Sequence, residues 1–359
     1  MAPIFKEFKK YNYLYEVKVV VTAQHREMLD NVLVFFGIIP DYDLNLMKPN
    51  QNLFQLTSDI LLGLKPILES YIPDYVFVHG DTTTSMAASL ACYYSGSKLC
   101  HVEAGLRTNN LKSPFPEEMN RQVTARIADF HFAPTQEAKS NLINENINED
   151  TIIITGNTVI DALKYSSKRI ESLENIEINT LKNNISTDKK VILVTAHRRE
   201  NFGIGFINIC EALKEIANQN NDVEIVFPVH LNPNVLDPVH KILGDVKNIK
   251  LITPLNYPAF VWLLNNCFLI ITDSGGIQEE ASSIGKPTLV LRHETERKEA
   301  ISSGGIILVG IDKDKIISEC NSLLHDNTKY NSMKVPQTIY GDGLASKKIV
   351  EFITNQFIE

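Results

Sequence analysis

The chain has 359 residues, with 44% hydrophobic residues, 22% charged residues and a formal net charge of -8. This composition is typical of a globular protein, and the length suits two domains of roughly 150 residues each. The acidic balance argues against a nucleic-acid partner bound by a broad basic face. The apolar run at residues 267–271 is too short to cross a bilayer, so we expect no membrane partner.

The cysteines and the first residues favour a cytoplasmic protein. The cysteine count is odd, and no pair has the two-residue spacing of a zinc or redox motif, which favours reduced, mostly buried thiols. Residues 1–10 are mixed in polarity and do not have the pattern of a signal peptide. The five cysteines are Cys92, Cys100, Cys210, Cys267 and Cys320.

Two series of short β-branched segments alternate with helical patterns such as Met86–Tyr94 and Phe206–Asn218. Continuous apolar strands between helices indicate parallel sheets covered on both faces. The sequence therefore predicts an α/β fold of two doubly wound, Rossmann-like domains. The first series of strands is Val17–Val21, Tyr75–Val78, Lys98–Val102, Phe130–Ala133 and Ile152–Thr155; the second is Val191–Thr195, Glu224–Pro228, Ile249–Ile252, Leu269–Thr272, Thr288–Leu291 and Ile306–Leu308.

A polar stretch, residues 167–190, lies between the two series and is interpreted as the domain boundary. Residues 344–357 have the pattern of one amphipathic helix. In open α/β sheets, ligands bind beyond the carboxyl ends of the strands. Two such domains facing a central cleft would place chemistry in the loops that follow the strands.

The loop after the strand Leu269–Thr272 is the strongest candidate for a phosphate site. Ser274, Gly275 and Gly276 precede the helical pattern Ile277–Ile284, and glycines let a ligand approach the backbone N–H groups at a helix start. We expect Glu280 in the first turn, where it would accept hydrogen bonds from ribose hydroxyls. The alternative is a tight strand-to-helix turn, in which the glycines only permit the backbone geometry and the glutamate only caps the helix.

Two arginines follow the next strand. Arg292 and Arg297 suit a pyrophosphate because a guanidinium is always charged and has a planar fork of donors. The alternative is a solvated, internally paired charge run.

Carboxylates end two strands of the first series. Asp81 follows the strand at residues 75–78, and Glu103 ends the strand at residues 98–102. A carboxylate held in such a place can acquire a shifted pKa and serve acid/base chemistry. The alternatives are that Asp81 only caps the next helix, and that Glu103 only pairs with Arg107 to fix its loop.

Further candidates lie at a helix start and after a second-series strand. Glu117 and Glu118 follow a proline-stiffened loop, where the helix dipole would favour acids in any case. His197 follows the strand at residues 191–195 and can shuttle protons or bind phosphate. Phe260 and Tyr257 can stack on a base, although aromatic residues at helical spacing usually belong to a core. The histidines sit in separate loops, so no metal site is expected: His79, His101, His197 and His230.

These loops together predict an α/β enzyme acting on a phosphorylated or nucleotide-linked substrate. In addition, six motifs in chain order resemble those of the non-hydrolysing UDP-GlcNAc 2-epimerases. The motifs are His79-Gly80-Asp81-Thr82-Thr83-Thr84, His101-Val102-Glu103-Ala104-Gly105-Leu106-Arg107, Pro116-Glu117-Glu118-Met119-Asn120-Arg121, His197-Arg198-Arg199-Glu200-Asn201, Ser274-Gly275-Gly276-Ile277-Gln278-Glu279-Glu280 and Thr295-Glu296-Arg297.

The resemblance implies a fold like that of the GT-B glycosyltransferases, with domains at 1–166 and 167–343 and with a C-terminal helix, 344–359, crossing back to the first domain. It implies the reversible interconversion of UDP-GlcNAc and UDP-ManNAc. In the family, UDP is eliminated as the C2 proton is removed, and UDP adds back to a 2-acetamidoglucal intermediate after reprotonation from the other face. No cofactor and no metal are implied, a homodimer is expected, and the product would serve cell-surface polysaccharide synthesis.

The resemblance also assigns residues by motif. The acid/base set would be Asp81, Glu103, Glu117 and His197. The UDP site would comprise Phe260, Ser274, Gly275, Gly276, Glu280, Arg292 and Arg297. Bacterial members use UDP-GlcNAc as an allosteric activator, and Gln24, Arg198 and His230 match that region. Glu27 stands where some members carry glutamine.

The resemblance departs from the family pattern at the start of the chain. In the family, a first strand and a Gly-Thr-Arg-Pro-Glu loop precede Met-Ala-Pro, which here is residues 1–3. That strand would lie between the strands at residues 17–21 and 75–78, so we expect a gap or closure of the sheet and impaired activity. The alternative is that the natural start lies upstream. Three alternative functions stay open: a hydrolysing epimerase, a GT-B glycosyltransferase, and an inactive subunit that binds nucleotide sugars.

Overall fold

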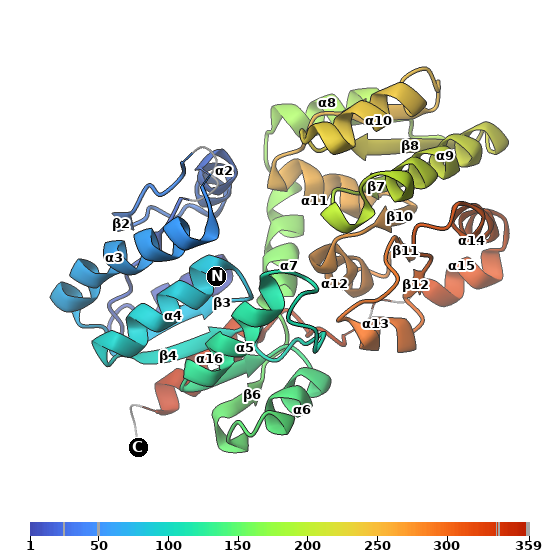
Figure 1. Cartoon of the computed structure of the whole chain (residues 1–359). Coiled ribbons are helices and arrows are strands. Elements are labelled where there is room, and N and C mark those ends of the chain that lie inside the picture. The colour runs from blue at the N-terminus through green and yellow to red at the C-terminus, as the bar shows by residue number, and fades with distance from the viewer. Residues whose placement is uncertain (24–25, 49–50, 335, 337, 357–359) are drawn as a thin grey trace. The chain divides into compact units, whose positions relative to one another are not determined.

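The computed structural model describes residues 1–23, 26–48, 51–334, 336 and 338–356 (Figure 1). The chain divides into two compact units. Unit 1 comprises Met1–Ala162 and Tyr340–Glu359, and unit 2 comprises Leu163–Ile339. The division falls inside one helix, α7 (Thr158–Ile170), and the polar stretch at residues 167–190 contains a further helix, α8 (Ile176–Asn184).

Unit 1 has two separate parallel sheets. The larger has the strand order β3-β4-β5-β6, and the smaller pairs β1 with β2. Within the described residues no ladder joins β1 to β3, and only the last two residues of the expected strand at 17–21 pair. The strands are β1 (Val20–Val21), β2 (Tyr42–Asp43), β3 (Tyr75–His79), β4 (Lys98–Val102), β5 (Phe130–Ala133) and β6 (Ile152–Ile154).

The helices of unit 1 bury apolar side chains against these strands. Ile4 and Phe8 of the first helix pack with Ile349 and Ile353 of the last, beside Phe132 of β5. The helices are α1 (Ala2–Phe8), α2 (Arg26–Phe36), α3 (Leu53–Tyr71), α4 (Thr83–Ser95), α5 (Glu117–Ile127), α6 (Gln136–Asn144), most of α7 and α16 (Ala345–Asn355), with 3-10 turns η1 (Lys9–Tyr11) and η2 (Glu149–Thr151).

The C-terminal helix α16 is fixed to unit 1 by its start. The carboxylate of Asp161 accepts hydrogen bonds from the backbone N–H groups of Ala345 (3.2 Å) and Ser346 (2.8 Å), which have no partner within their own helix. Just before α16, a Cβ added to Gly156 would lie 2.8 Å from the Cα of Gly341. This close passage of two chain segments needs glycine.

Unit 2 is one six-stranded parallel sheet, with helices packed against it. Its strand order is β12-β11-β10-β7-β8-β9, so the order reverses between β10 and β7. Loops after these two strands lie at a topological switch point, the usual ligand site of such sheets. The strands are β7 (Lys190–Thr195), β8 (Val223–Pro228), β9 (Ile249–Ile252), β10 (Leu269–Thr272), β11 (Thr288–Val290) and β12 (Ile306–Leu308).

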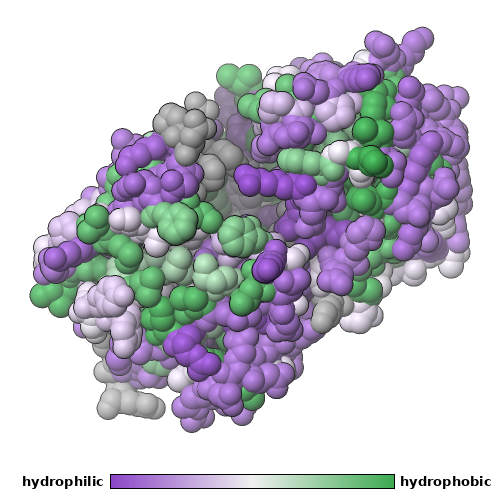
Figure 2. Space-filling view, in the orientation of Figure 1, coloured by the Kyte–Doolittle hydropathy of each residue, from purple (hydrophilic) through white to green (hydrophobic). Residues whose placement is uncertain are grey.

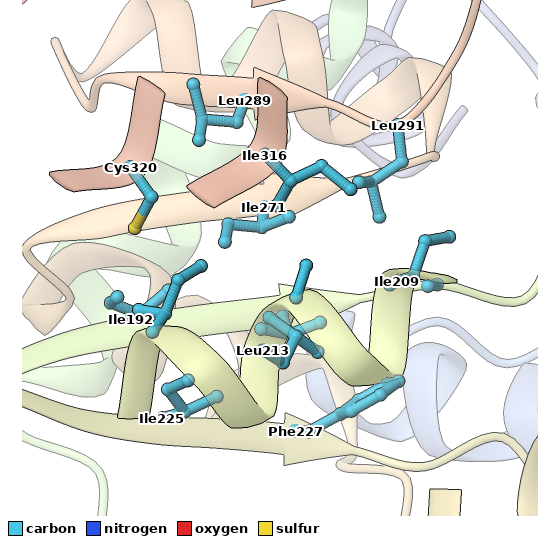
Figure 3. Close-up of a cluster of buried hydrophobic side chains, with 14 of the residues drawn as sticks. Ile192, Ile209, Leu213, Ile225, Phe227, Ile271, Leu289, Leu291, Ile316 and Cys320 are labelled. Atoms are coloured by element: carbon cyan, nitrogen blue, oxygen red, sulfur yellow. The ribbon is translucent and has the colours of Figure 1, made fainter. Parts of the chain in front are cut away.

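The core of unit 2 lies between its sheet and two helices. Figure 3 shows Ile225 and Ile271 of the strands pointing toward Leu213 of α9 and Ile316 of α14, and all four are fully buried. Besides α8, the helices are α9 (Ile204–Gln219), α10 (Pro233–Leu243), α11 (Tyr257–Asn266), α12 (Gly275–Ser283), α13 (Lys298–Ser302), α14 (Lys313–His325) and α15 (Asn327–Met333), with the 3-10 turn η3 (Arg199–Asn201).

The α/β class and the parallel sheets are therefore as the sequence predicts. All five cysteines are buried and unpaired, in agreement with the prediction of free thiols. A search of the described residues finds no helix with the length and apolarity needed to cross a bilayer.

Candidate active site

Asp81 follows β3 in unit 1 and is held by a buried arginine. Its carboxylate accepts a hydrogen bond of 2.6 Å from Arg121 Nη1, and its backbone carbonyl accepts one from Asn120 Nδ2. Thr82, whose hydroxyl accepts from Ser85 N–H, caps α4 instead. The capping alternative for Asp81 is therefore wrong, and 30% of its side chain remains exposed.

Glu103 follows β4 with a φ of 63°, in the left-handed region that a glutamate rarely adopts. Its Oε2 accepts a 2.7 Å hydrogen bond from Asn157 Nδ2, and its Oε1 lies where a Cβ on Gly80 would come within 3.3 Å. Arg107 pairs with Glu145 at 2.7 Å. The expected alternative, a Glu103–Arg107 pair, is therefore wrong, and Glu103 lies in a strained backbone position, which is common at functional sites.

Two histidines near Glu103 are neutral at pH 7. Burial lowers the pKa of His79 and of His101 to about 3. Nε2 of His101 lies 2.9 Å from the carbonyl oxygen of Gly80, and Nε2 of His79 lies 3.9 Å from the Glu103 carboxylate. These neutral rings shape the end of the β3–β4 pair without adding positive charge beside Glu103.

The adjacent acids Glu117 and Glu118 have different surroundings. Glu118 is fully buried, and its carboxylate accepts hydrogen bonds from the backbone N–H groups of Thr108 and Asn109 and from Arg121. Glu117 is the first residue of α5 and is half-buried. No described group donates a hydrogen bond to its carboxylate. Glu118 therefore fixes the structure, and Glu117 is available for chemistry.

In unit 2, the helix that follows β10 begins earlier than expected. Helix α12 starts at Gly275 rather than Ile277, so Glu280 lies in the second turn, and the prediction of the first turn is wrong. The hydroxyl of Ser274, the N-cap residue, makes no capping hydrogen bond. A Cβ on Gly276 would meet nothing within 4 Å. The backbone at this helix start is therefore open to an anion.

The two arginines of the predicted pyrophosphate site are buried and internally paired. Arg292 Nη1 lies 2.9 Å from Glu296, and Arg292 Nε lies 3.4 Å from Glu200. Arg297 pairs with Glu296 and, at 2.9 Å, with Glu279. Burial alone would raise the pKa of Glu296, but the two guanidinium groups lower it to about 2. Both arginines are thus paired with the ionised carboxylate of Glu296.

Arg297 also lies against the start of α12. A Cβ on Gly275 would come 2.6 Å from Arg297 Nη1, so the glycine makes room for the guanidinium at this helix end. Gly275 has no positive φ, and it is needed for space rather than for backbone conformation. A guanidinium beside free helix N–H groups is an arrangement that binds phosphate.

Glu280 is a buried acid that forms no ion pair with a cationic side chain among the described residues. Burial first, and then the charge of Glu279, raise the pKa of Glu280 to about 8. At pH 7 this side chain is therefore mostly protonated and can both donate and accept hydrogen bonds. Phe260, on α11, is half-buried, and burial raises the pKa of Tyr257 on the same helix.

His197 follows β7 at the switch point, and its loop is held by Asp273. Asp273 Oδ2 accepts hydrogen bonds from the backbone N–H groups of His197 (2.9 Å) and Arg198 (2.8 Å), and one from Asn201 Nδ2. The His197 ring is stacked on that of His230, with the centroids 5.6 Å apart. The histidine side chain is 46% exposed, whereas that of Asp273 is fully buried.

Of the predicted site residues, unit 1 brings Asp81, Glu103 and Glu117 to the ends of β3 and β4 and to the start of α5. Unit 2 places the remainder after β7, β8, β10 and β11, except for Phe260 on α11. Gln24 lies outside the described residues. In the described chain, no three His, Cys, Asp or Glu side chains form a metal-binding group.

The sequence analysis missed three residues that form hydrogen bonds with the candidate residues Asp81, Glu103 and His197. They are Arg121, Asn157 and Asp273, respectively. Arg121 is the last residue of one recognised motif and Asp273 directly precedes another, so these charged residues were a usable signal. Nothing in the sequence marked Asn157.

The two parallel α/β units contain acids that follow strands, a helix start that is open to an anion, and buried arginines. Together these features define an enzyme for a nucleotide-linked substrate. The family model of the UDP-N-acetylglucosamine 2-epimerases matches residues 6–354. The chain therefore belongs to the UDP-N-acetylglucosamine 2-epimerase family, and it is an isomerase. The family resemblance of the sequence motifs and the expected GT-B-like fold are confirmed.

Individual relatives agree along nearly the whole chain. The chain is 53% identical to the UDP-N-acetylglucosamine 2-epimerase of Escherichia coli K12, over 100% of this chain and 96% of that protein. The structure of the Neisseria meningitidis UDP-GlcNAc 2-epimerase bound to UDP-GlcNAc superposes with a TM-score of 0.94 at 48% identity, covering 99% and 96% of the two chains. The Methanocaldococcus jannaschii enzyme, in complex with UDP-GlcNAc and UDP, gives 0.85 at 32% identity, covering 99% and 95%.

Proposed function

We propose that this protein interconverts UDP-GlcNAc and UDP-ManNAc by inverting C2 of the sugar. The main evidence is Glu103, a strand-end carboxylate that has a strained backbone conformation and accepts a hydrogen bond from Asn157. In addition, the epimerase family model matches nearly the whole chain. The relatives solved with UDP-GlcNAc support the choice of substrate.

The proposed reaction has two balanced steps. A carboxylate takes the proton from C2 while the bond between C1 and the UDP oxygen breaks, and UDP leaves with the bonding electron pair. The product is a 2-acetamidoglucal. A second acid then gives a proton to C2 from the other face, and the UDP oxygen re-forms the bond to C1. We assign this acid/base work to Asp81, Glu103, Glu117 and His197.

The groups of unit 2 would hold UDP during elimination. The α12 N–H groups at Gly275 and Gly276, the Ser274 hydroxyl and the two arginines, Arg292 and Arg297, suit the diphosphate. Glu280, protonated at pH 7, suits the ribose hydroxyls, and Phe260 suits the uracil face. Retention of UDP by these groups would favour its re-addition over its loss.

A second UDP-GlcNAc is proposed as an activator near Arg198 and His230. Arg198 is half-buried and His230 is exposed, so both can contact a ligand. Gln24, the third residue of this proposal, lies outside the described residues.

We further propose a cytoplasmic homodimer. Large apolar side chains are exposed on helices of unit 1, including Phe54 (90%), Leu62 (68%), Tyr93 (67%) and Tyr94 (74%). Figure 2 shows apolar residues gathered on the face that carries α3 and α4. A second copy would cover such a surface. Light scattering would give the mass, and Phe54→Glu with Tyr93→Glu should yield a monomer.

The reaction is tested by incubating the protein with UDP-GlcNAc in deuterated water and following the sugar by NMR. We expect UDP-ManNAc carrying deuterium at C2. Free ManNAc with UDP would instead show a hydrolysing epimerase, and transfer of the sugar to an acceptor would show a glycosyltransferase. UDP binding without exchange would indicate an inactive binding subunit.

A further inference from the structure

We propose that Asp273 is a positioning residue, which fixes the loop carrying His197 and also sets the orientation and tautomer of the His197 imidazole. This inference rests on the role proposed above for His197 and adds a residue to that site. Asp273 does not touch the substrate in this proposal and acts only through the histidine.

The first observation is how the two oxygens of Asp273 differ. Oδ2 is already hydrogen-bonded, because it accepts from His197 N–H, Arg198 N–H and Asn201 Nδ2. Oδ1 is buried and has no hydrogen-bond partner within the described residues. It lies 3.6 Å from His197 Nδ1. A buried carboxylate oxygen left unpaired costs free energy, so a small rotation of the ring that closes this contact is favourable.

The second observation is the restraint on the imidazole from its other neighbours. The ring of His230 lies nearly parallel to it, with an interplanar angle of 13°. Asp273 lies directly after β10, and His197 lies two residues after β7. Thr195 and Thr272, at the ends of these paired strands, are joined by a 2.6 Å hydrogen bond between their hydroxyls. The carboxylate and the imidazole are thus carried by adjacent strands of a rigid sheet.

The chemistry follows from hydrogen-bond polarity. An ionised carboxylate only accepts, so Oδ1 selects the imidazole tautomer with hydrogen on Nδ1. Nε2 is then left without hydrogen and is free to accept a proton from, or after protonation to donate one to, a bound molecule. A carboxylate that holds a histidine in one tautomer is a general means of fixing which nitrogen reacts.

Asp273→Asn separates this role from simple support of the loop. The asparagine oxygen can still accept from His197 N–H and Arg198 N–H, while its NH₂ group faces Nδ1 and favours the opposite tautomer. We expect kcat for epimerisation to fall by about 10² to 10⁴-fold. KM and the affinity for UDP should change less than about threefold, because the groups that hold UDP remain.

Two comparisons complete the kinetic test. Asp273→Asn combined with His197→Asn should be no slower than His197→Asn alone, because both act through one imidazole. Glu224→Gln is the matched control: this buried carboxylate of β8 accepts from Ser186 N–H and pairs with Lys250, and no described histidine forms a hydrogen bond or ion pair with it. It should leave kcat unchanged. Additive losses, or an equal loss in Glu224→Gln, would overturn the proposal.

A measurement independent of turnover keeps the inference separate from the proposed function. In ¹⁵N-histidine NMR, with the His197 signal assigned from His197→Asn, we expect hydrogen on Nδ1 in the wild-type chain and on Nε2 in Asp273→Asn. Hydrogen on Nε2 in the wild type, or the same tautomer in both, overturns the role of Asp273. If the wild type shows the expected tautomer but no epimerisation, the proposed function fails and the positioning role stands.

Discussion

The candidate groups of unit 1 and unit 2 differ in how their charges are held. In unit 1, the carboxylate of Asp81 accepts a hydrogen bond from Arg121 and that of Glu103 from Asn157, and both side chains stay partly exposed. In unit 2, Arg292 and Arg297 are buried and paired with carboxylates. Groups that must exchange a proton need an open oxygen, whereas groups that bind a fixed diphosphate gain from being locked in place.

The difference also separates chemistry from stability. Removing a partly exposed acid in unit 1 takes away an oxygen that is proposed to exchange a proton, and little packing is lost with it. Removing a charge from the buried network of unit 2 leaves its partners uncompensated in a medium that solvates them poorly. Removing an acid of unit 1 should therefore lower kcat. Removing a charge from the buried network of unit 2 should lower the free energy of unfolding as well as the affinity for UDP.

The largest effect is expected from Glu103→Gln. Glutamine keeps an oxygen that can accept from Asn157 but cannot take a proton from C2, so kcat should fall by about 10² to 10⁴-fold. UDP-GlcNAc affinity, measured by calorimetry, should be retained. The control is Glu149→Gln, at an exposed carboxylate that pairs with Lys139 at the surface. A Glu103→Gln enzyme with near wild-type kcat would contradict the assignment.

Arg297→Met should weaken both UDP binding and the fold. The substitution leaves Glu279 and Glu296 without this guanidinium in a buried site, so the free energy of unfolding should fall by about 3 kcal/mol. UDP affinity should fall at least about tenfold. Urea unfolding and calorimetry measure the two effects. Lys65→Met, at an exposed surface pair with Glu69, should cost less than about 1 kcal/mol; equal losses in both variants would remove the contrast between buried and surface pairs.

The neighbours Glu117 and Glu118 allow the comparison to be made within unit 1. Glu118→Gln disturbs a buried carboxylate that holds two backbone N–H groups, so the free energy of unfolding should fall by about 1–3 kcal/mol. Glu117→Gln should leave unfolding unchanged and lower kcat. Thermal unfolding and initial rates of both variants decide the matter. If Glu117→Gln lowered stability and Glu118→Gln lowered only kcat, Glu118 would be the reactive acid and Glu117 the structural one.

The smallest effect, taken for one pH unit, concerns the pH dependence of Glu280. Its pKa is about 8 in the folded protein, against an ordinary value of 4.5, so the folded state holds a proton that the unfolded state releases between these values. Stability contributed by this group is therefore lost as the pH rises from about 5 to 8. Compared with Glu280→Gln, the wild type should lose on the order of 1 kcal/mol per pH unit there. Unfolding of both proteins at several pH values gives the difference, and parallel curves would show that Glu280 is ionised throughout.

The strands were predictable because parallel, buried strands are continuous apolar runs. Ile249–Ile252 and Leu269–Thr272 are found with the expected bounds. The strand β2 was missed because its two residues, Tyr42 and Asp43, carry no such pattern. Its backbone pairing with β1 is the only feature that makes it a strand.

The candidate residues were predictable from position, but their partners were not. Asp81 and His197 lie in loops that follow strands, so a correct prediction of the strands is enough to find these two residues. That Arg121 binds Asp81, and that Asp273 holds His197, depends on contacts between segments 40 and 76 residues apart. Similarly, only burial distinguishes Glu118 from Glu117, because the two have the same chemistry and adjacent places in the helix.

The return of the last helix to unit 1 has a consequence for synthesis on the ribosome. Unit 2 is one continuous stretch, Leu163–Ile339, and all its strands are available once that stretch has emerged. Unit 1 also needs α16, whose N–H groups bind Asp161 and whose Ile349 and Ile353 cover the sheet. The earlier part of unit 1 must therefore wait, with that apolar surface uncovered, until the residues of α16 have been synthesised.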